Sequence, residues 1–142
     1  MEKFRIDEPI HVFGFEVKSF PLGIGEAFDS LIDKVPDGLA RPYYGISYCT
    51  DSGVVYLAAA LEKFAGEGKQ LGYDVYTIAS GSYDAITVPD WRTKTESIKD
   101  VFMELMKDNT PDKDSPCIEW YKNDDEMVCL VKERGIKKEV RG

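Results

Sequence analysis

Glu119 is the residue of this chain whose type and setting point most clearly to chemistry. It lies in the run Cys117-Ile118-Glu119-Trp120-Tyr121, which has the apolar and aromatic content of a strand. On a strand, Glu119 and Tyr121 point to one face, and Ile118 and Trp120 point to the other. We expect the apolar pair to face packed helices, so Glu119 and Tyr121 should lie on the side away from them.

Two environments are open for Glu119. On a plain solvent-facing sheet it is an ordinary exposed carboxylate. In a closed cleft lined by aromatic rings, burial would shift its pKa, or a bound cation would become its partner. A carboxylate with tyrosines beside it has the means for two kinds of chemistry, which are charge pairing with a lipophilic cation and general-base catalysis.

Other reactive groups are scarce. His11 is the single histidine, and we interpret it as an edge residue of the first strand rather than as part of a catalytic triad. The cysteines Cys49, Cys117 and Cys129 show no CxxC spacing and are interpreted as reduced thiols. One histidine and unspaced cysteines also predict that there is no metal site. The glycines at positions 23 and 25 lack the rest of a phosphate-binding motif. The sequence therefore predicts no cofactor.

The chain reads as two copies of one strand-helix-strand-strand unit. An offset of 74 positions aligns the two helix cores and sets Gly45 against Glu119. The same offset, without a gap, pairs Val54 with Val128 and Leu57 with Val131. The first strands align at an offset of 68, which predicts an insertion in the second copy over residues 91–96. We place repeat 1 at about residues 10–63 and repeat 2 at about residues 73–134.

Periodicity and turn residues predict the elements of both copies. Strands are expected at residues 11–20, 43–49, 54–61, 73–88, 117–122 and 127–132, helices at 25–35 and 97–107, and a linker at 64–72. The predicted fold class is α+β, with the duplicated β-α-β-β unit in a pseudo-twofold array. We expect one domain over residues 1–142, in which an antiparallel sheet carries two helices on one face and a ligand groove on the other.

Aromatic side chains are expected to wall this groove. Tyr43 occupies the repeat position of Cys117, and Tyr83 occupies that of Phe15. Trp91 begins the insertion, which is placed to hang over the mouth of a groove. Tyrosine and tryptophan supply large apolar contacts together with one polar group.

Composition and charge narrow the class of protein. The 142 residues are 43% hydrophobic and 31% charged, as in soluble globular domains, and no apolar run is long enough to cross a membrane. The start lacks the pattern of a signal peptide, so a cytoplasmic location is expected. The net charge of −8 argues against nucleic acid as a partner. The sequence leaves open whether the chain forms a homo-oligomer.

The layout resembles the GyrI-like small-molecule-binding domains, which also serve as effector-binding domains of AraC-type and MerR-type multidrug regulators. The resemblance spans essentially the whole chain. It rests on the Ile78-Ala79-Ser80-Gly81-Ser82-Tyr83 segment, similar to a Gly-x-Tyr strand of that family, and on Pro116 to Tyr121, where the groove glutamate of the family falls on Glu119. By position, the resemblance implies ligand contacts at Glu119, Tyr121, Trp91, Tyr43 and Tyr83.

The resemblance implies a stand-alone protein that binds an amphipathic, cationic, aromatic small molecule and has no DNA-binding segment of its own. Some stand-alone members of that family hydrolyse cyclopropane-bearing toxins, with the glutamate activating water. The alternative is therefore a hydrolase of electrophilic small molecules, with Glu119 as general base and Tyr121 assisting. A third reading is a module that docks on another protein through its acidic surface.

Overall fold

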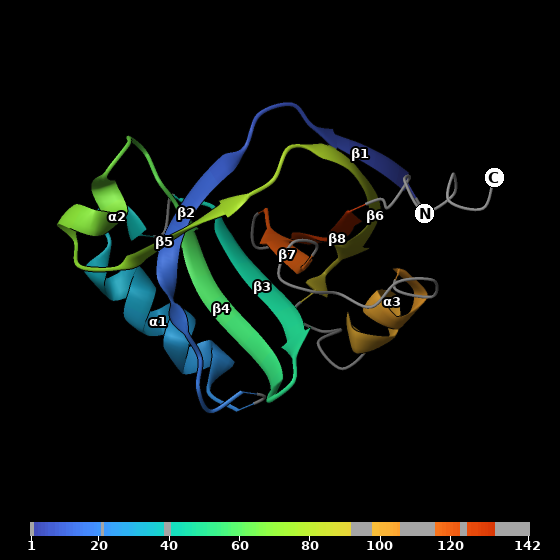
Figure 1. Cartoon of the computed structure of the whole chain (residues 1–142), viewed down its shortest axis with the longest axis horizontal. Helices are drawn as coiled ribbons and strands as arrows, with labels where there is room; N and C mark the ends of the chain where they lie inside the picture. Colours follow the sequence, from blue (N-terminus) through green and yellow to red (C-terminus); the bar gives the residue numbers. More distant parts are fainter. Residues whose placement is uncertain are drawn as a thin grey trace.

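The eight strands of the chain form one antiparallel sheet, which curls into a half-barrel (Figure 1). The structure is a computed structural model that describes residues 2–20, 22–38, 41–91, 98–105, 116–122 and 125–132. The strand order is β1-β6-β8-β7-β3-β4-β2-β5. The strands are β1 (Glu2–Ile6), β2 (Ile10–Glu16), β3 (Tyr43–Thr50), β4 (Gly53–Leu61), β5 (Asp74–Ile78), β6 (Gly81–Pro89), β7 (Cys117–Tyr121) and β8 (Glu126–Lys132).

Three helices lie within the described residues, and all three pack on the same face of the sheet, here called the helix-bearing face. They are α1 (Ile24–Lys34), α2 (Glu67–Gln70) and α3 (Ile98–Leu105). Helix α1 begins after Gly23, whose φ of 87° is favourable for glycine, and packs Phe28 and Leu31 onto β4. Helix α3 packs Phe102 and Leu105 over β6 and β8. No helix among the described residues has the length and hydrophobicity needed to span a membrane.

Both faces of the sheet are apolar. On the helix-bearing face, three clusters of buried side chains lie under the helices. The opposite face holds the largest cluster, which contains no helix residue and includes Tyr44, Tyr83, Ile118 and Leu130. The curl of the sheet and the strand β1 cover this opposite face. As a consequence, alternation along a strand does not separate a buried face from a solvated one.

The observed elements agree with most of the expected ones, but two expected elements are corrected and one strand is additional. The strand expected over 73–88 is two strands, β5 and β6, separated at Ala79 and Ser80. The segment expected as a linker over 64–72 contains the short helix α2. Strand β1 was not expected; it is short, and its partner β6 is distant in sequence. Of the insertion expected at 91–96, only Trp91 lies within the described residues.

The first strands are exchanged between the two halves of the chain. Strand β1 pairs with β6, whereas β5, which precedes β6 in sequence, pairs with β2. Phe4 and Ile6 on β1 thereby occupy places in the opposite-face cluster like those of Tyr76 and Ile78 on β5. This arrangement fits the predicted duplication, but it starts each unit one strand earlier than the sequence indicated.

The gapless offset of 74 is wrong beyond the hairpins. It holds at the centre of the sheet, where Gly45 on β3 pairs directly with Glu119 on β7. Past the turns, however, Leu57 lies on the opposite face and Val131 lies on the helix-bearing face. Gly45 faces Ala58 on β4, while Glu119 faces Cys129 on β8, so the second hairpin is shorter than the first.

A buried ion pair joins segments of the chain that meet near the end of β4. Arg41 donates to both carboxylate oxygens of Glu67, at 2.8 and 2.9 Å, and to the backbone carbonyls of Pro36 and Leu61. Both side chains are buried, and the guanidinium lowers the pKa of Glu67. Because the partners neutralise each other, this charged pair is structural and leaves no charge for a ligand.

Candidate functional site

The Glu119 carboxylate is held by two tyrosines on the helix-bearing face. The hydroxyl of Tyr56, on β4, donates to Oε1 at 2.6 Å, and the hydroxyl of Tyr121, on β7, donates to the same oxygen at 2.7 Å. Tyr56 is buried, whereas Glu119 and Tyr121 each keep part of their surface exposed. The carboxylate is thus fixed in place by neutral donors while remaining within reach of a ligand.

Gly45 makes room for this arrangement. A Cβ added at Gly45 would overlap both the Tyr56 hydroxyl and Glu119 Oε1, far inside van der Waals contact. Glu119 is flanked by Gly45 on β3 and by Cys129 on β8, so small residues lie on both sides of it. The carboxylate and the Tyr56 hydroxyl therefore occupy the space above the glycine backbone.

Aromatic rings surround the two tyrosines. Phe20 stacks on Tyr56 with ring centroids 5.1 Å apart. Phe28, from α1, and Trp91, just after β6, meet Tyr121 edge-on at 5.4 and 4.9 Å. Tyr121 packs against the clusters under both α1 and α3, so the site lies between these two helices.

Among the described residues, no cation neutralises the Glu119 carboxylate. Burial raises the pKa of its carboxyl, and the hydrogen bonds from Tyr56 and Tyr121 offset this only in part. Burial and the neighbouring Glu119 charge in turn raise the pKa of both tyrosines, so both stay protonated donors. Within the described part of the chain, no basic side chain pairs with Glu119.

The expectation that Glu119 faces away from the helices is wrong. Trp120 and Ile118, expected under the helices, belong to the opposite-face cluster, where Trp120 packs against Phe4 of β1 at 5.8 Å. The reason is that β1 supplies an apolar partner that the sequence did not reveal. The groove therefore cannot lie on the helix-free face, as predicted, if it is to contain Glu119.

Four of the five expected site residues come together, and one does not. Glu119, Tyr121, Trp91 and Tyr43 share the helix-bearing face, with Tyr43 6.2 Å from Phe28 and its hydroxyl bonded to the carbonyl of Gly38. Tyr83 is buried in the opposite-face cluster and donates to the carbonyl of Ala79 at 2.6 Å. The offset of 68 equated it with Phe15, which lies on the helix-bearing face.

Sequence reasoning missed three residues of the site, namely Phe20, Phe28 and Tyr56. Phe28 carried the helical spacing of a core residue, and Phe20 lies in a turn, so neither showed a functional signal. Tyr56 was detectable, because correct pairing of β3 with β4 puts Tyr56 opposite Ser47, two positions along the strand from Gly45.

The cysteines and the histidine take no part in the Glu119 hydrogen bonds. No disulfide joins the three cysteines, and burial raises the pKa of Cys117 and Cys129 to about 12, so both stay protonated. His11 lies exposed on β2, 3.4 Å from the Thr77 hydroxyl. No group of His, Cys, Asp or Glu in the described ranges is arranged to hold a metal ion.

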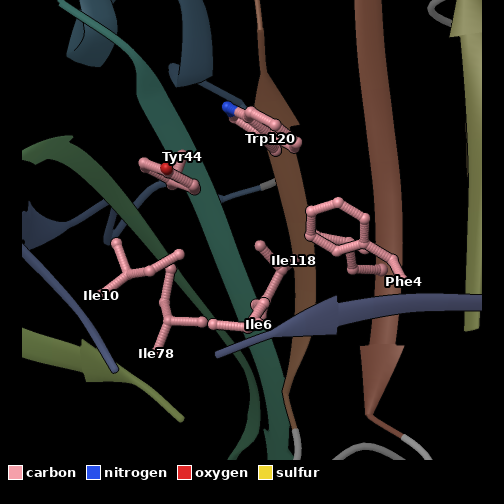
Figure 2. Close-up of a pocket in the computed structure, with 8 residues that line it drawn as sticks. Phe4, Ile6, Ile10, Tyr44, Ile78, Ile118 and Trp120 are labelled. Atoms are coloured by element: carbon pink, nitrogen blue, oxygen red, sulfur yellow. The ribbon is translucent and has the colours of Figure 1, made fainter. Parts of the chain in front are cut away.

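The opposite face holds a small apolar pocket (Figure 2). Its cavity of about 50 Å³ is too small for a multi-ring ligand, since a cavity of about 150 Å³ holds one benzene. Figure 2 shows Tyr44 and Trp120 as the residues with polar atoms among its labelled lining, and neither carries a charge. The charged site and this pocket thus lie on different faces, joined by alternating residues of β7.

The raised pKa of Glu119 predicts a pH-dependent effect of Glu119→Gln on stability. The folded state holds the Glu119 proton to higher pH than the unfolded state does, so wild-type stability falls as the pH rises from about 4.3 towards the folded pKa. Glu119→Gln removes this loss, so its free energy of unfolding should exceed that of wild type at neutral pH and match it below about pH 4. Urea unfolding across this range measures the difference, with exposed Glu8→Gln as control. A difference that does not change with pH would contradict the buried carboxyl.

Gly45→Ala is expected to disrupt the site, because its methyl group would displace the Glu119 carboxylate and the Tyr56 hydroxyl. We expect a loss of about 1–3 kcal/mol in the free energy of unfolding. Gly25→Ala is the matched control, since its Cβ meets open space in α1 and should leave stability equal or higher. Adding Tyr56→Phe to Gly45→Ala should recover part of the loss. Full stability of Gly45→Ala would show that the carboxylate is not held there.

No protein-family model and no curated protein sequence matches this chain. Several solved structures share its fold over nearly their whole length. The integron cassette protein VCH_CASS2 from the mobile metagenome of Vibrio cholerae has a TM-score of 0.68 and 17% identity, covering 94% of this chain and 95% of that one. SAV2435, in a structure bound to tetraphenylphosphonium, has a TM-score of 0.65 and 15% identity, covering 96% and 95%.

A third structure, described as a transcription regulation protein of Staphylococcus aureus MU50, has a TM-score of 0.56 and 16% identity, with 93% and 97% covered. At these identities the likeness concerns the fold. The chain thus has the fold of a cassette protein, a ligand-bound protein and a regulator-related protein, which is consistent with the GyrI-like resemblance in its sequence.

Proposed function

We propose that this chain binds a lipophilic, aromatic cation on the helix-bearing face. One observation carries the proposal, which is that the partly buried Glu119 carboxylate is held by two neutral hydroxyls and paired with no described cation. A bound cation would supply the missing positive charge. The proposed binding unit is the single duplicated domain over residues 1–142.

The aromatic residues support this ligand class. Tyr121 is partly exposed beside the carboxylate, and Trp91 and Phe28 are partly exposed beside Tyr121, so a cation at Glu119 would lie near several rings. Each cation–π contact contributes about 0.5–2 kcal/mol. We assign ligand contact to Glu119, Tyr121 and Trp91. Tyr43 would support the site indirectly, through its ring contact with Phe28. Tyr56 would orient the carboxylate.

The fold gives independent support. SAV2435 has this fold and binds tetraphenylphosphonium, a cation that carries four phenyl rings. The same chemical class, one positive charge surrounded by rings, suits a carboxylate in an aromatic setting. A net charge of −8 further favours a cation over an anion.

Tetraphenylphosphonium provides the direct test. Isothermal titration calorimetry should detect binding to wild type, and Glu119→Gln should weaken it by about tenfold or more, equivalent to about 1.4 kcal/mol. Glu8→Gln, which removes one charge elsewhere, and Tyr83→Phe, on the opposite face, should leave the affinity within twofold. Affinity should also rise with pH as Glu119 ionises. Equal affinity in wild type and Glu119→Gln would refute the proposal.

The raised pKa of Glu119 favours a second candidate, a hydrolase of electrophilic small molecules. A general base is most effective with a pKa near the operating pH, and burial moves Glu119 in that direction. The hydroxyls of Tyr56 and Tyr121 would orient the base. Mass spectrometry of cyclopropane-bearing compounds incubated with the protein should then show added water, abolished in Glu119→Gln. Compounds left intact by wild type would remove this candidate.

A further inference from the structure

The two oxygens of the Glu119 carboxylate have different surroundings. Both tyrosine hydroxyls donate to Oε1, and no described residue donates to Oε2. An ionised carboxylate offers about four lone-pair positions, and the two tyrosines satisfy those of only one oxygen. The hydrogen-bonding capacity of Oε2 is therefore unused by the part of the protein that the structure describes.

Oε2 also reaches accessible space. Within the described ranges, the buried side-chain atoms without a hydrogen-bond partner are Nε of Arg41 and Nε1 of Trp120. Oε2 is not among them, and Glu119 as a whole keeps part of its surface exposed. Oε2 is thus the carboxylate oxygen that is open to a hydrogen bond from a ligand.

We propose that the ligand of this site is a protonated amine or amidine, which donates an N–H hydrogen bond to Glu119 Oε2 while its aromatic part lies against Trp91, Tyr121 and Phe28. The inference rests on the proposed function and narrows its ligand class. A cation without N–H, such as tetraphenylphosphonium, can use the charge and the rings but leaves Oε2 without a donor. A charge-assisted N–H bond is among the strongest hydrogen bonds in proteins.

The positions of the two tyrosines favour Oε2, rather than Oε1, as the acceptor for the ligand. Because Tyr56 and Tyr121 approach from one side, they fix the orientation of the carboxylate and leave Oε2 on the other side. Gly45 leaves room for one carboxylate oxygen close to the sheet, where both hydroxyls reach it. A preorganised acceptor of this kind binds a donor without the free-energy cost of first reorienting the carboxylate.

The test uses two cations with the same triphenylethyl group, one with three N–H groups on its nitrogen and the other with three N-methyl groups. Protonated 2,2,2-triphenylethylamine and its N,N,N-trimethyl derivative share three phenyl rings and one positive charge. Calorimetry with the full chain should show the ammonium binding about tenfold or more tightly than the trimethyl compound. In Glu119→Gln the preference should disappear, because the side-chain amide presents a donor of its own in place of one oxygen. Tyr121→Phe, which removes a donor to Oε1 only, should retain the preference.

The outcomes separate this inference from the proposed function. If both compounds bind wild type equally, or the trimethyl compound binds more tightly, and Glu119→Gln weakens both, the cation site stands and the amine preference is overturned. The preference is also overturned if it persists in Glu119→Gln, or if tetraphenylphosphonium binds and neither triphenylethyl compound does. If none of the three cations binds, the proposed function itself fails.

Discussion

The arrangement of the site depends on one interaction, the pair of hydrogen bonds that two tyrosine hydroxyls donate to a single oxygen of Glu119. A buried carboxylate is normally stabilised by a cation or by protonation. Here burial raises the pKa of the Glu119 carboxyl, and the two hydroxyls, which favour the ionised form, offset that rise only in part. The stacked ring of Phe20, the glycine at position 45 and the edge contacts on Tyr121 all keep this one carboxylate in position.

The asymmetry between the two halves has a physical reason. Gly45 and Glu119 are equivalent in the predicted duplication, and they are direct neighbours on the central strand pair β3–β7. Two glutamates at these positions would have Cβ atoms about 4.5–5.5 Å apart, and their like charges would repel. A glutamate in one copy therefore requires a small neutral residue in the other. Glycine meets this need and also frees the volume that the carboxylate and the Tyr56 hydroxyl fill.

The sequence predicted what local patterns determine and missed what distant pairing determines. The first helix, expected over 25–35 and observed over 24–34, and the strands of both hairpins followed from apolar spacing and turns, whereas the role of Glu119 stays a prediction. The exchange of β1 and β5 did not follow from such patterns, because their partners β6 and β2 both lie far away in sequence. The wrong face for Glu119 followed from that omission. With β1 covering the opposite face, Trp120 is as well buried there as under a helix, so hydrophobicity alone cannot choose between the faces.

Register on β3 connects the fold to the site. Gly45 leaves room for the Glu119 side chain because the two residues are direct partners in the β3–β7 pair. The neighbours of Gly45, Tyr44 and Ile46, point to the opposite face. A slip of one residue between β3 and β7 would exchange the faces and bring an apolar side chain beside the carboxylate. The tight β3–β4 turn at Asp51 and Ser52 fixes one side of this register, and the pairing of Cys129 with Glu119 fixes the other. The site is therefore a property of the whole central sheet, in which four strands must align before one carboxylate lies between two helices.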